Sequence, residues 1–328
     1  MTMNYGWPDD HCLRAALTLA VRAPSVHNTQ PWRFRISERA VQLYLDPTWA
    51  HQPSDFDQRD VVLSCGAVLH HLRVALAASG WSAVVRRLPN AANPNCLASI
   101  ELVPHRPTML DSALGNAIPH RQTDRRNFSS APIPPGYLGL VNERATTLGA
   151  SVRQAVDTAR ERLVEALRAA TVLDSAEPQY RLELANWSGR PTTPGGLPAR
   201  SIPLRSDPDG SLRPVAAAPH AGSGHEPDFA ELLVLATSGD DRLAQLCAGE
   251  ALSAVLLTAT NVGLATCVLT DPLQVPELRQ RIRVGVLDGR GYPQAVIRIG
   301  WTADAAALPF TPRHALGDVL ERYEATAC

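Results

Sequence analysis

The chain has 328 residues, 45% of them apolar, and its 31 basic and 32 acidic side chains leave a net charge of −1. The apolar content predicts a substantial core in one large domain or two of ordinary size, and it argues against general disorder. The balanced charge argues against nucleic acid and anionic membrane surfaces as partners.

The compartment is predicted from what the sequence lacks. The N-terminal segment, MTMNYGWPDDHC, has no basic stretch followed by an apolar one, and no run of about 18 apolar residues spans a bilayer. The cysteines are scattered and form no C-x-x-C pair, which favours reduced thiols. They are Cys12, Cys65, Cys96, Cys247, Cys267 and Cys328. We therefore expect a cytoplasmic protein.

In the first third of the chain, apolar periodicity and turn residues predict two helices and four strands. The helices are expected over 9–21 and 64–79, the second ending at Gly80. The strands are expected over 32–36, 41–45, 83–88 and 98–103. A turn-rich stretch over 104–119 is expected to separate two halves.

The rest of the chain repeats this mixture of elements. Helices are expected over 134–148, 157–170 and 241–261, the last closed by Gly263. Strands are expected over 232–237, 264–269 and 295–301, apolar enough to be central strands. Strands mixed with long helices predict an α+β or α/β fold.

One long segment, residues 187–228, contains PTTPGGLP, DPDGSLRP and HAGSGHEP and is too rich in proline and glycine for regular elements. A loop of this length inside a domain is usually a functional lid or disordered. We favour a lid, because tryptophan and several arginines interrupt it.

Four short strings carry the chemistry. The first, APSVHNTQPWRF at 23–34, places Asn28 and Gln30 in a loop after a helix, and their amides offer both donors and acceptors to a heteroaromatic ring edge. The second, HRQTDRRNF at 120–128, offers guanidinium forks that suit a phosphate. The third and fourth are GLATCVLTDP at 263–272 and LPFTPRHAL at 308–316. Taken singly, the first three can also be a structural turn, a solvated charged turn, and a buried strand with the turn after it.

Together the strings resemble the flavin-dependent nitroreductase superfamily, with its S-x-x-N-x-Q-P-W loop, R-x-[ST]-x-[RK] motif and G-L-x-x-x-P-x-E-G segment. The resemblance implies an α+β nitroreductase-like fold and bound FMN. It places Arg121, Thr123 and Arg313 on the phosphate and ribityl oxygens, and Arg125 near N1 and O2 of the ring. The other implied FMN contacts are Pro24, Ser25, Asn28, Gln30, Val268, Leu269, Thr270 and Asp271. The family's usual Glu-Gly is replaced here by Thr270-Asp271.

The distribution of the motifs predicts one site per chain. The Ser-Asn-Gln loop occurs only in the first half, and the other three strings occur only in the second. The chain thus resembles a fused, diverged pseudo-dimer, with lobes at 1–115 and 116–328 and the 187–228 lid inserted in the second. Over about 9–320 it resembles the two-lobed Acg-type FMN-binding family of actinobacterial stress and dormancy responses. A monomer is favoured, and a homodimer stays open.

Two functions follow from the resemblance. The first is an oxidoreductase in which FMN takes a hydride from NAD(P)H and reduces a nitroaromatic, quinone or similar small acceptor. No side chain is assigned as catalytic. The alternative is a non-catalytic protein that stores FMN under a closed lid.

Three other groups of residues give weaker functional predictions. His70 and His71 are adjacent on a helix and face different ways, so no metal site is expected. Ser25 lacks the G-x-S-x-G setting of a hydrolase nucleophile. Gly285, Gly289 and Gly291 follow no clear strand and are interpreted as a turn rather than a dinucleotide motif.

Overall fold

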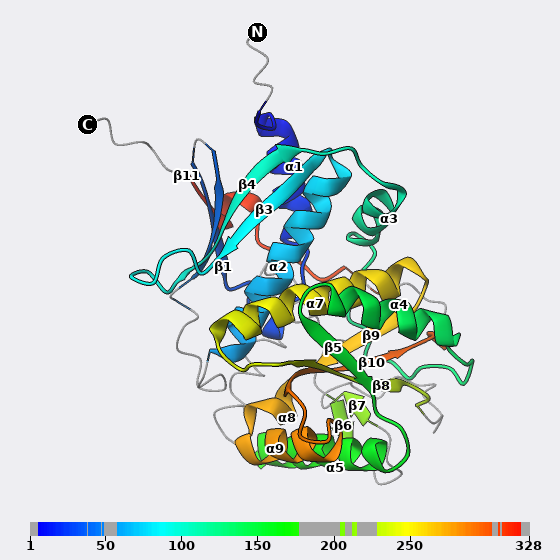
Figure 1. The fold of residues 1–328 in the computed structure, drawn as a ribbon. Coiled ribbons are helices and arrows are strands. Elements are labelled where there is room, and N and C mark those ends of the chain that lie inside the picture. Colours follow the sequence, from blue (N-terminus) through cyan, green and yellow to red (C-terminus); the bar gives the residue numbers. More distant parts are fainter. Residues whose placement is uncertain are drawn as a thin grey trace.

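Two antiparallel-based sheets, one in each half of the chain, organise the molecule (Figure 1). The computed structural model describes residues 6–37, 39–46, 48, 58–176, 204–206, 212–214, 228–303, 308 and 310–322. The predicted lid therefore lies almost entirely outside the described residues. The mixed α+β architecture predicted from the sequence is confirmed.

The first sheet has the strand order β11-β1-β2-β4-β3. Its strands are β1 (Trp32–Ile36), β2 (Val41–Leu45), β3 (Trp81–Arg87), β4 (Cys96–Pro104) and β11 (Leu320–Arg322). Successive side chains alternate between the core and solvent, with Trp32 and Phe34 fully buried and Arg33 and Arg35 partly exposed. Three helices contribute to the same core: α1 (Asp10–Ala20), α2 (Arg59–Ala78) and α3 (Met109–Ala117).

The second sheet has the order β5-β8-β10-β9 and carries helices on both faces. Its strands are β5 (Ala150–Gln154), β8 (Glu231–Thr237), β9 (Ala265–Leu269) and β10 (Tyr292–Gly300). One face is covered by α4 (Pro135–Thr146) and α7 (Arg242–Asn261), the other by α5 (Asp157–Ala176), α8 (Asp271–Gln274) and α9 (Pro276–Gly285) (Figure 1). Burial on both faces explains why β8 and β10 are almost continuously apolar.

The two sheets have the same topology. In each, the first, second, fourth and third strands in chain order lie side by side, and all these neighbours are antiparallel. In each, a 20-residue helix joins the second strand to the third, α2 in the first half and α7 in the second. This repeat is the internal two-fold similarity that the motif distribution predicted.

The two long helices cross at a pair of glycines. Gly66 and Gly249 are each the eighth residue of their helix, and a Cβ on Gly66 would lie 2.1 Å from the Leu246 carbonyl oxygen. A Cβ on Gly249 would lie 2.0 Å from the Leu63 carbonyl oxygen. Only glycine permits this approach of two helix backbones, so the crossing fixes how the halves meet.

By length and composition alone, α2 and α7 could cross a membrane, with mean hydropathies of 1.6 and 1.4. Most of both helices is buried inside the protein, which accounts for their apolar character. Occasional polar residues interrupt the apolar run of each helix.

Several sequence-based expectations need correction. The stretch over 104–119 contains helix α3, begun by a capping box between Thr108 and Asp111. Helix α2 begins at Arg59 rather than Ser64. The segment over 187–228 does contain regular elements, because β6 (Leu204–Ser206) pairs with β7 (Leu212–Pro214). Gly285 ends α9, and Gly289 and Gly291 adopt φ of 74° and 76° in the turn that follows.

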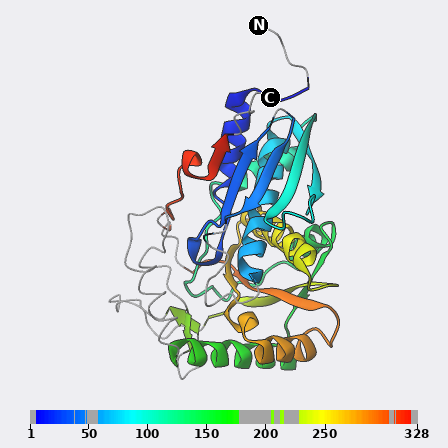
Figure 2. The ribbon, with the colours of Figure 1, turned by 90° about the vertical axis from the view of Figure 1, so that its left-hand side faces the viewer.

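The C-terminal segment returns to the first half. After a short helix, α10 (Leu316–Val319), strand β11 pairs in parallel with β1, placing Leu320 opposite Phe34. Figure 2 shows this strand, in red, beside the blue strands of the first sheet. The second predicted lobe, 116–328, thus contributes one strand to the first sheet. The boundary at 115–116 stays a prediction.

Candidate functional site

The loop after α1 has a shape that few side chains allow. His27, Asn28 and Gln30 adopt positive φ values of 46°, 58° and 52°, in the left-handed region where non-glycine residues are uncommon. Such conformations persist only where the surroundings hold them, and they concentrate at functional sites. The short helix η1 (Val26–Asn28) lies within this loop.

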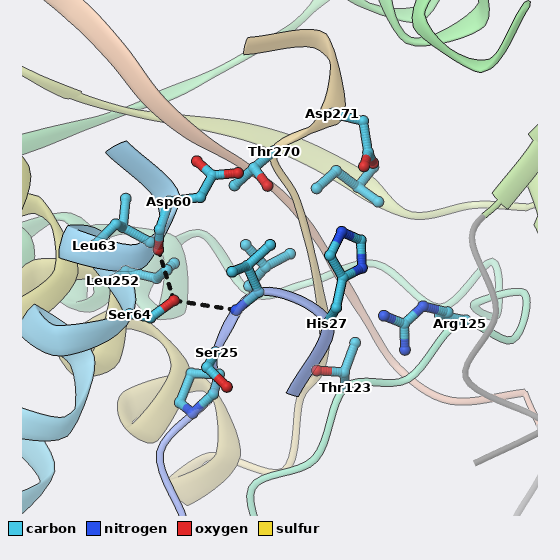
Figure 3. A pocket seen from close by; sticks show the side chains of 14 residues that line it. Ser25, His27, Asp60, Leu63, Ser64, Thr123, Arg125, Leu252, Thr270 and Asp271 are labelled. Atoms are coloured by element: carbon cyan, nitrogen blue, oxygen red, sulfur yellow. Dashed lines mark hydrogen bonds between the residues drawn. The ribbon is translucent and has the colours of Figure 1, made fainter. Parts of the chain in front are cut away.

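Hydrogen bonds hold the loop in place. Ser64 on α2 accepts a hydrogen bond from the Val26 backbone N–H at 3.1 Å and donates to the Asp60 carbonyl oxygen at 2.6 Å (Figure 3). Within the loop, Ser25 Oγ accepts from the Gln30 backbone N–H at 3.0 Å. Asn28 donates to the carbonyl oxygen of Pro312 at 3.0 Å, so the loop is also anchored to the C-terminal segment.

A hollow lies beside this loop, between the two halves of the molecule. It holds about 790 Å³ of space not filled by atoms, a volume that includes open solvent. It is lined by Pro24, Ser25, Val26, His27, Asp60, Leu63, Ser64, Thr123, Arg125, Leu252, Val268, Leu269, Thr270 and Asp271. Leucine and valine side chains from both halves form its apolar wall, and we call it the ring pocket.

A second, more polar hollow adjoins it. Five residues line both hollows: Pro24, Ser25, His27, Thr123 and Arg125. The second hollow is completed by Arg22, Asn28, Arg121, Gln122, Thr311 and Arg313, and we call it the arginine pocket. The pair therefore offers one continuous site with an apolar end and a cationic end.

The loop after α3 is held at the site by backbone hydrogen bonding to β9. Thr123 forms an isolated parallel bridge with Thr266, and the Asp124 N–H donates to the Thr266 carbonyl oxygen at 2.8 Å. The Asp124 carboxylate is paired with Arg126 at 2.7 Å. Arg125, between them, makes no hydrogen bond or ion pair with the described residues, which leaves its guanidinium available to a ligand.

The arginine pocket gathers buried positive charge. Arg121 is 5% exposed, and burial together with the nearby Arg22 charge lowers the pKa of Arg121 to about 10. Burial, with the charges of Arg121 and Arg22, lowers the pKa of Arg313 to about 9. Both groups still carry their charge at pH 7.

These charges have little to neutralise them. Arg121 and Arg313 donate to the Arg22 backbone carbonyl at 3.4 and 3.3 Å, and no carboxylate in the described part of the chain pairs with either side chain. The Nε atoms of Arg22, Arg121 and Arg313 are buried without a hydrogen-bond partner there. Unpaired buried cations are costly, so this arrangement favours a bound anion.

At the opposite end, two carboxylates face the ring pocket. Asp60, in the first turn of α2, is 1% exposed and paired with Arg59 at 2.5 Å. Asp271 begins α8, and burial raises the pKa of its carboxyl group, with the Asp60 charge acting in the same direction. The charges of His27 and Arg125 act against that rise.

The structure brings eleven of the twelve predicted site residues to these two pockets. They are Pro24, Ser25, Asn28, Arg121, Thr123, Arg125, Val268, Leu269, Thr270, Asp271 and Arg313. Gln30 lines neither pocket, and its side-chain oxygen instead accepts from the His314 backbone N–H at 2.9 Å. Gln30 therefore links the loop to the C-terminal segment.

Sequence reasoning missed several lining residues. His27 lies inside the first string, and Arg22 directly precedes that string. Asp60, Leu63 and Leu252 lie on long helices whose register against the loop no local pattern reveals. A third arginine next to the loop was the one available signal.

Neither metal nor disulfide chemistry is indicated by the described residues. Among them no group of three or more His, Cys, Asp or Glu side chains could hold a metal ion. The cysteines described are free thiols, namely Cys12, Cys65, Cys96, Cys247 and Cys267.

Comparison with known proteins gives close relatives. The chain is 44% identical to a Mycobacterium tuberculosis H37Rv protein named "Putative NAD(P)H nitroreductase Rv3131", over 97% of this chain and 94% of the relative. It is 37% identical to "Putative NAD(P)H nitroreductase acg" of the same strain, over 94% of each. A third relative, "Uncharacterized protein Rv3127", is 35% identical over 94% of this chain and 92% of its own length. No protein-family model matches.

Solved structures are more distant. The chain is 18% identical to the FMN-dependent nitroreductase NfnB from Mycobacterium smegmatis, solved with NADPH, with a TM-score of 0.41 over 64% of this chain and 97% of that one. A nitroreductase with bound FMN from Bacteroides fragilis is 15% identical, with a TM-score of 0.40 over 62% and 95%.

Proposed function

Since this chain belongs to the family of the mycobacterial proteins named as NAD(P)H nitroreductases, we propose that it is an FMN-binding oxidoreductase. In this function NAD(P)H reduces the bound flavin, which then reduces a nitroaromatic or quinone-type acceptor. We expect it to act in the cytoplasm. The observation that carries the cofactor assignment is the arginine pocket beside the apolar ring pocket.

The charge and polarity of the residues in the two pockets fit FMN. A flavin phosphate would meet Arg121 and Arg313, whose unpaired Nε atoms and lack of carboxylate partners call for an anion. Arg22, a half-buried residue whose Nε atom is enclosed, adds to the same positive charge. An isoalloxazine ring needs an apolar wall and a few polar groups, which the ring pocket offers.

The protein's part in the chemistry is to position the flavin and to neutralise negative charge on its ring. When bound, FMN supplies the hydride and electron transfer. Arg125 presents a guanidinium without a partner among the described residues, suited to stabilising negative charge that develops on the ring. Leu63, Leu252 and Val268 keep water from one side of the pocket, and Ser25 and Asn28 hold the loop that closes the other.

The decisive experiment compares two flavins that differ only in the phosphate. Apoprotein is titrated with FMN and with riboflavin, and flavin absorbance is followed before and after anaerobic addition of NADH or NADPH. We expect FMN to bind, riboflavin to bind at least tenfold more weakly, and reduced nicotinamide to bleach the bound FMN. No binding of FMN would overturn the proposal.

The same titration separates the alternative function. FMN that binds and is reduced by dithionite, but not by NADH or NADPH, would make the protein a flavin store. The replacement of the family's Glu-Gly by Thr270-Asp271, in the wall of the ring pocket, is the observation that favours this alternative.

A further inference from the structure

Asp271 differs from the other acidic group of the ring pocket in its surroundings. The Asp60 carboxylate has two fixed partners, Arg59 Nη2 at 2.5 Å and Gln274 Nε2 at 2.8 Å. Among the described residues, the Asp271 carboxyl group forms no ion pair and accepts a hydrogen bond from its own backbone N–H, and it points into the pocket (Figure 3). Two carboxyl groups therefore share one hollow, one anchored by a cation and the other open to a ligand.

The surroundings of Asp271 favour its protonated form. Burial raises the pKa of its carboxyl group, and the nearby Asp60 charge acts in the same direction. The groups that face Asp271 are Asp60 from α2, His27 from η1 and Arg125 from the loop after α3, and the last two, with the backbone N–H of Asp271, act against the rise without reversing it. A raised carboxyl pKa beside a second carboxyl group in one pocket is a common setting for a general acid.

We propose that Asp271 is the proton donor of the site and delivers its carboxyl proton to an oxygen atom of the electron acceptor. The proposal rests on the proposed function, because it assumes that an acceptor is reduced in the ring pocket. It also accounts for an acidic side chain where the family usually has Glu-Gly: the acid here stands one position later, at the start of α8.

The step balances. Reduction of a quinone to a hydroquinone consumes one hydride and one proton, and reduction of a nitro group to a nitroso group consumes the same two and releases water. The hydride brings both electrons, and NAD(P)H supplies it by way of the cofactor. The Asp271 O–H bond breaks as the new O–H bond forms on the acceptor. The resulting carboxylate takes a proton back from water before the next turnover.

His27 and Arg125 complete this end of the pocket. The left-handed backbone at His27 carries its imidazole into the hollow, where it lines the pocket with Asp271 and Arg125 (Figure 3). His27 and Arg125 can both donate hydrogen bonds, and they face the same part of the pocket as Asp271. They suit an acceptor whose oxygens carry partial negative charge, which selects nitro and quinone compounds over apolar ones.

The first test does not require turnover. Infrared spectra of FMN-loaded wild type and Asp271→Asn are compared near neutral pH, with Asp10→Asn as a matched control on an exposed carboxylate of α1. The expected result is a protonated-carboxyl band that Asp271→Asn lacks and Asp10→Asn retains. Its absence from wild type would overturn the proposal.

The second test is kinetic and uses two oxidants. Reduced, FMN-loaded protein is mixed rapidly with a benzoquinone, which takes up protons, or with ferricyanide, which takes electrons alone. Asp271→Asn should slow reoxidation by the quinone about 100-fold, in the range of general-acid effects. It should slow reoxidation by ferricyanide far less than reoxidation by the quinone, and Asp271→Glu should restore part of the quinone rate.

The outcomes separate this proposal from the proposed function. Equal quinone rates in wild type and Asp271→Asn would overturn the proton-donor role while leaving the oxidoreductase intact. If wild-type flavin is not reduced by NAD(P)H, the proposed function fails. Reoxidation of dithionite-reduced protein by the same two oxidants then still decides the role of Asp271.

Discussion

Three arginines, two of them with lowered pKa values, set the character of the site at the scale of single residues. Arg121 and Arg313 come from segments almost two hundred residues apart, yet both donate to one backbone carbonyl, that of Arg22. Each contributes a guanidinium whose Nε atom is buried. The cost of burying these cations is offset only when an anion is present.

Removing one of these cations should weaken FMN binding. Arg121→Ala is expected to reduce affinity by about 2 kcal/mol, because a charge-assisted bond to phosphate is lost. Flavin fluorescence titration measures this, with Arg106→Ala as the control, since Arg106 is exposed and lines neither pocket. Unchanged affinity in Arg121→Ala would contradict the phosphate assignment, whereas riboflavin affinity should be unaffected in both variants.

The arginine pocket should also make the apoprotein sensitive to anions and pH. The folded state lowers the pKa of Arg313 to about 9, so it holds that proton less tightly than the unfolded chain does. The stability that this group contributes is present above its unfolded pKa and is lost as pH falls through about 9. At pH 7 the apoprotein therefore carries an unfavourable charge that an anion relieves.

The measurement is the thermal midpoint of the apoprotein at pH 7 with and without millimolar inorganic phosphate. Phosphate is expected to raise the midpoint through binding to the folded state, and Arg313→Met should reduce that gain. An equal gain from chloride at the same ionic strength would show general screening instead of a phosphate site.

At the scale of elements, the crossing of α2 and α7 is the most constrained contact. Gly66→Ala should lower the free energy of unfolding by about 3 kcal/mol, because its methyl group has no room beside the Leu246 carbonyl. Urea unfolding measures this change. Gly139→Ala is the control: it lies in α4 with nothing within 4 Å of a Cβ, and it should add about 0.5–1 kcal/mol. Equal stabilisation by both substitutions would show that the helices separate freely.

Elements with strong local signals were predictable, and those defined by distant partners were not. Strands β1 and β2 match the prediction residue for residue, because alternation and a polar turn define them locally. The capping box at Thr108 was a readable signal for α3 that the surrounding turn residues obscured. Strand β11 has three residues and owes its conformation to β1, so no local pattern predicts it.

The site residues that belong to a family motif were predictable from the sequence, and the others were not. Positions such as Arg125 and Asp271 came from motif resemblance, and they meet in space because Thr123 is fastened to β9. His27 and Asp60 belong to no such motif. Their place in the pocket depends on the register of η1 against α2, which Ser64 fixes through one hydrogen bond.

At the scale of the whole molecule, the internal repeat identifies the position in the first half that corresponds to the ring pocket. Gly80 and Gly263 end the two long helices with φ of 90° and 84°, separated by the same number of residues as Gly66 and Gly249. In that alignment Arg87 stands where Thr270 lines the ring pocket. Its guanidinium contacts Glu250 at 2.5 Å, and Arg73 contacts the other oxygen at 2.7 Å. An ion cluster therefore occupies the symmetry-related position.

We expect one FMN per chain and a monomer in solution. The ion cluster around Glu250 occupies the second position, and the α2–α7 contact that joins the halves is already internal. Sedimentation followed at protein and flavin wavelengths measures mass and stoichiometry together. Two flavins per chain, or a stable dimer, would contradict this view of the repeat.

The order in which the chain is synthesised bears on when the site can exist. Asn28 and Pro312, which share a hydrogen bond, lie 284 residues apart, and β1 has its outer partner only in β11. Closing so long a loop is slow. A nascent first half emerging from the ribosome carries β1 with its outer edge exposed and open to pairing with other chains. Loading of flavin must therefore wait until residues 312–322 have emerged, which makes cofactor capture one of the last events in the folding of this protein.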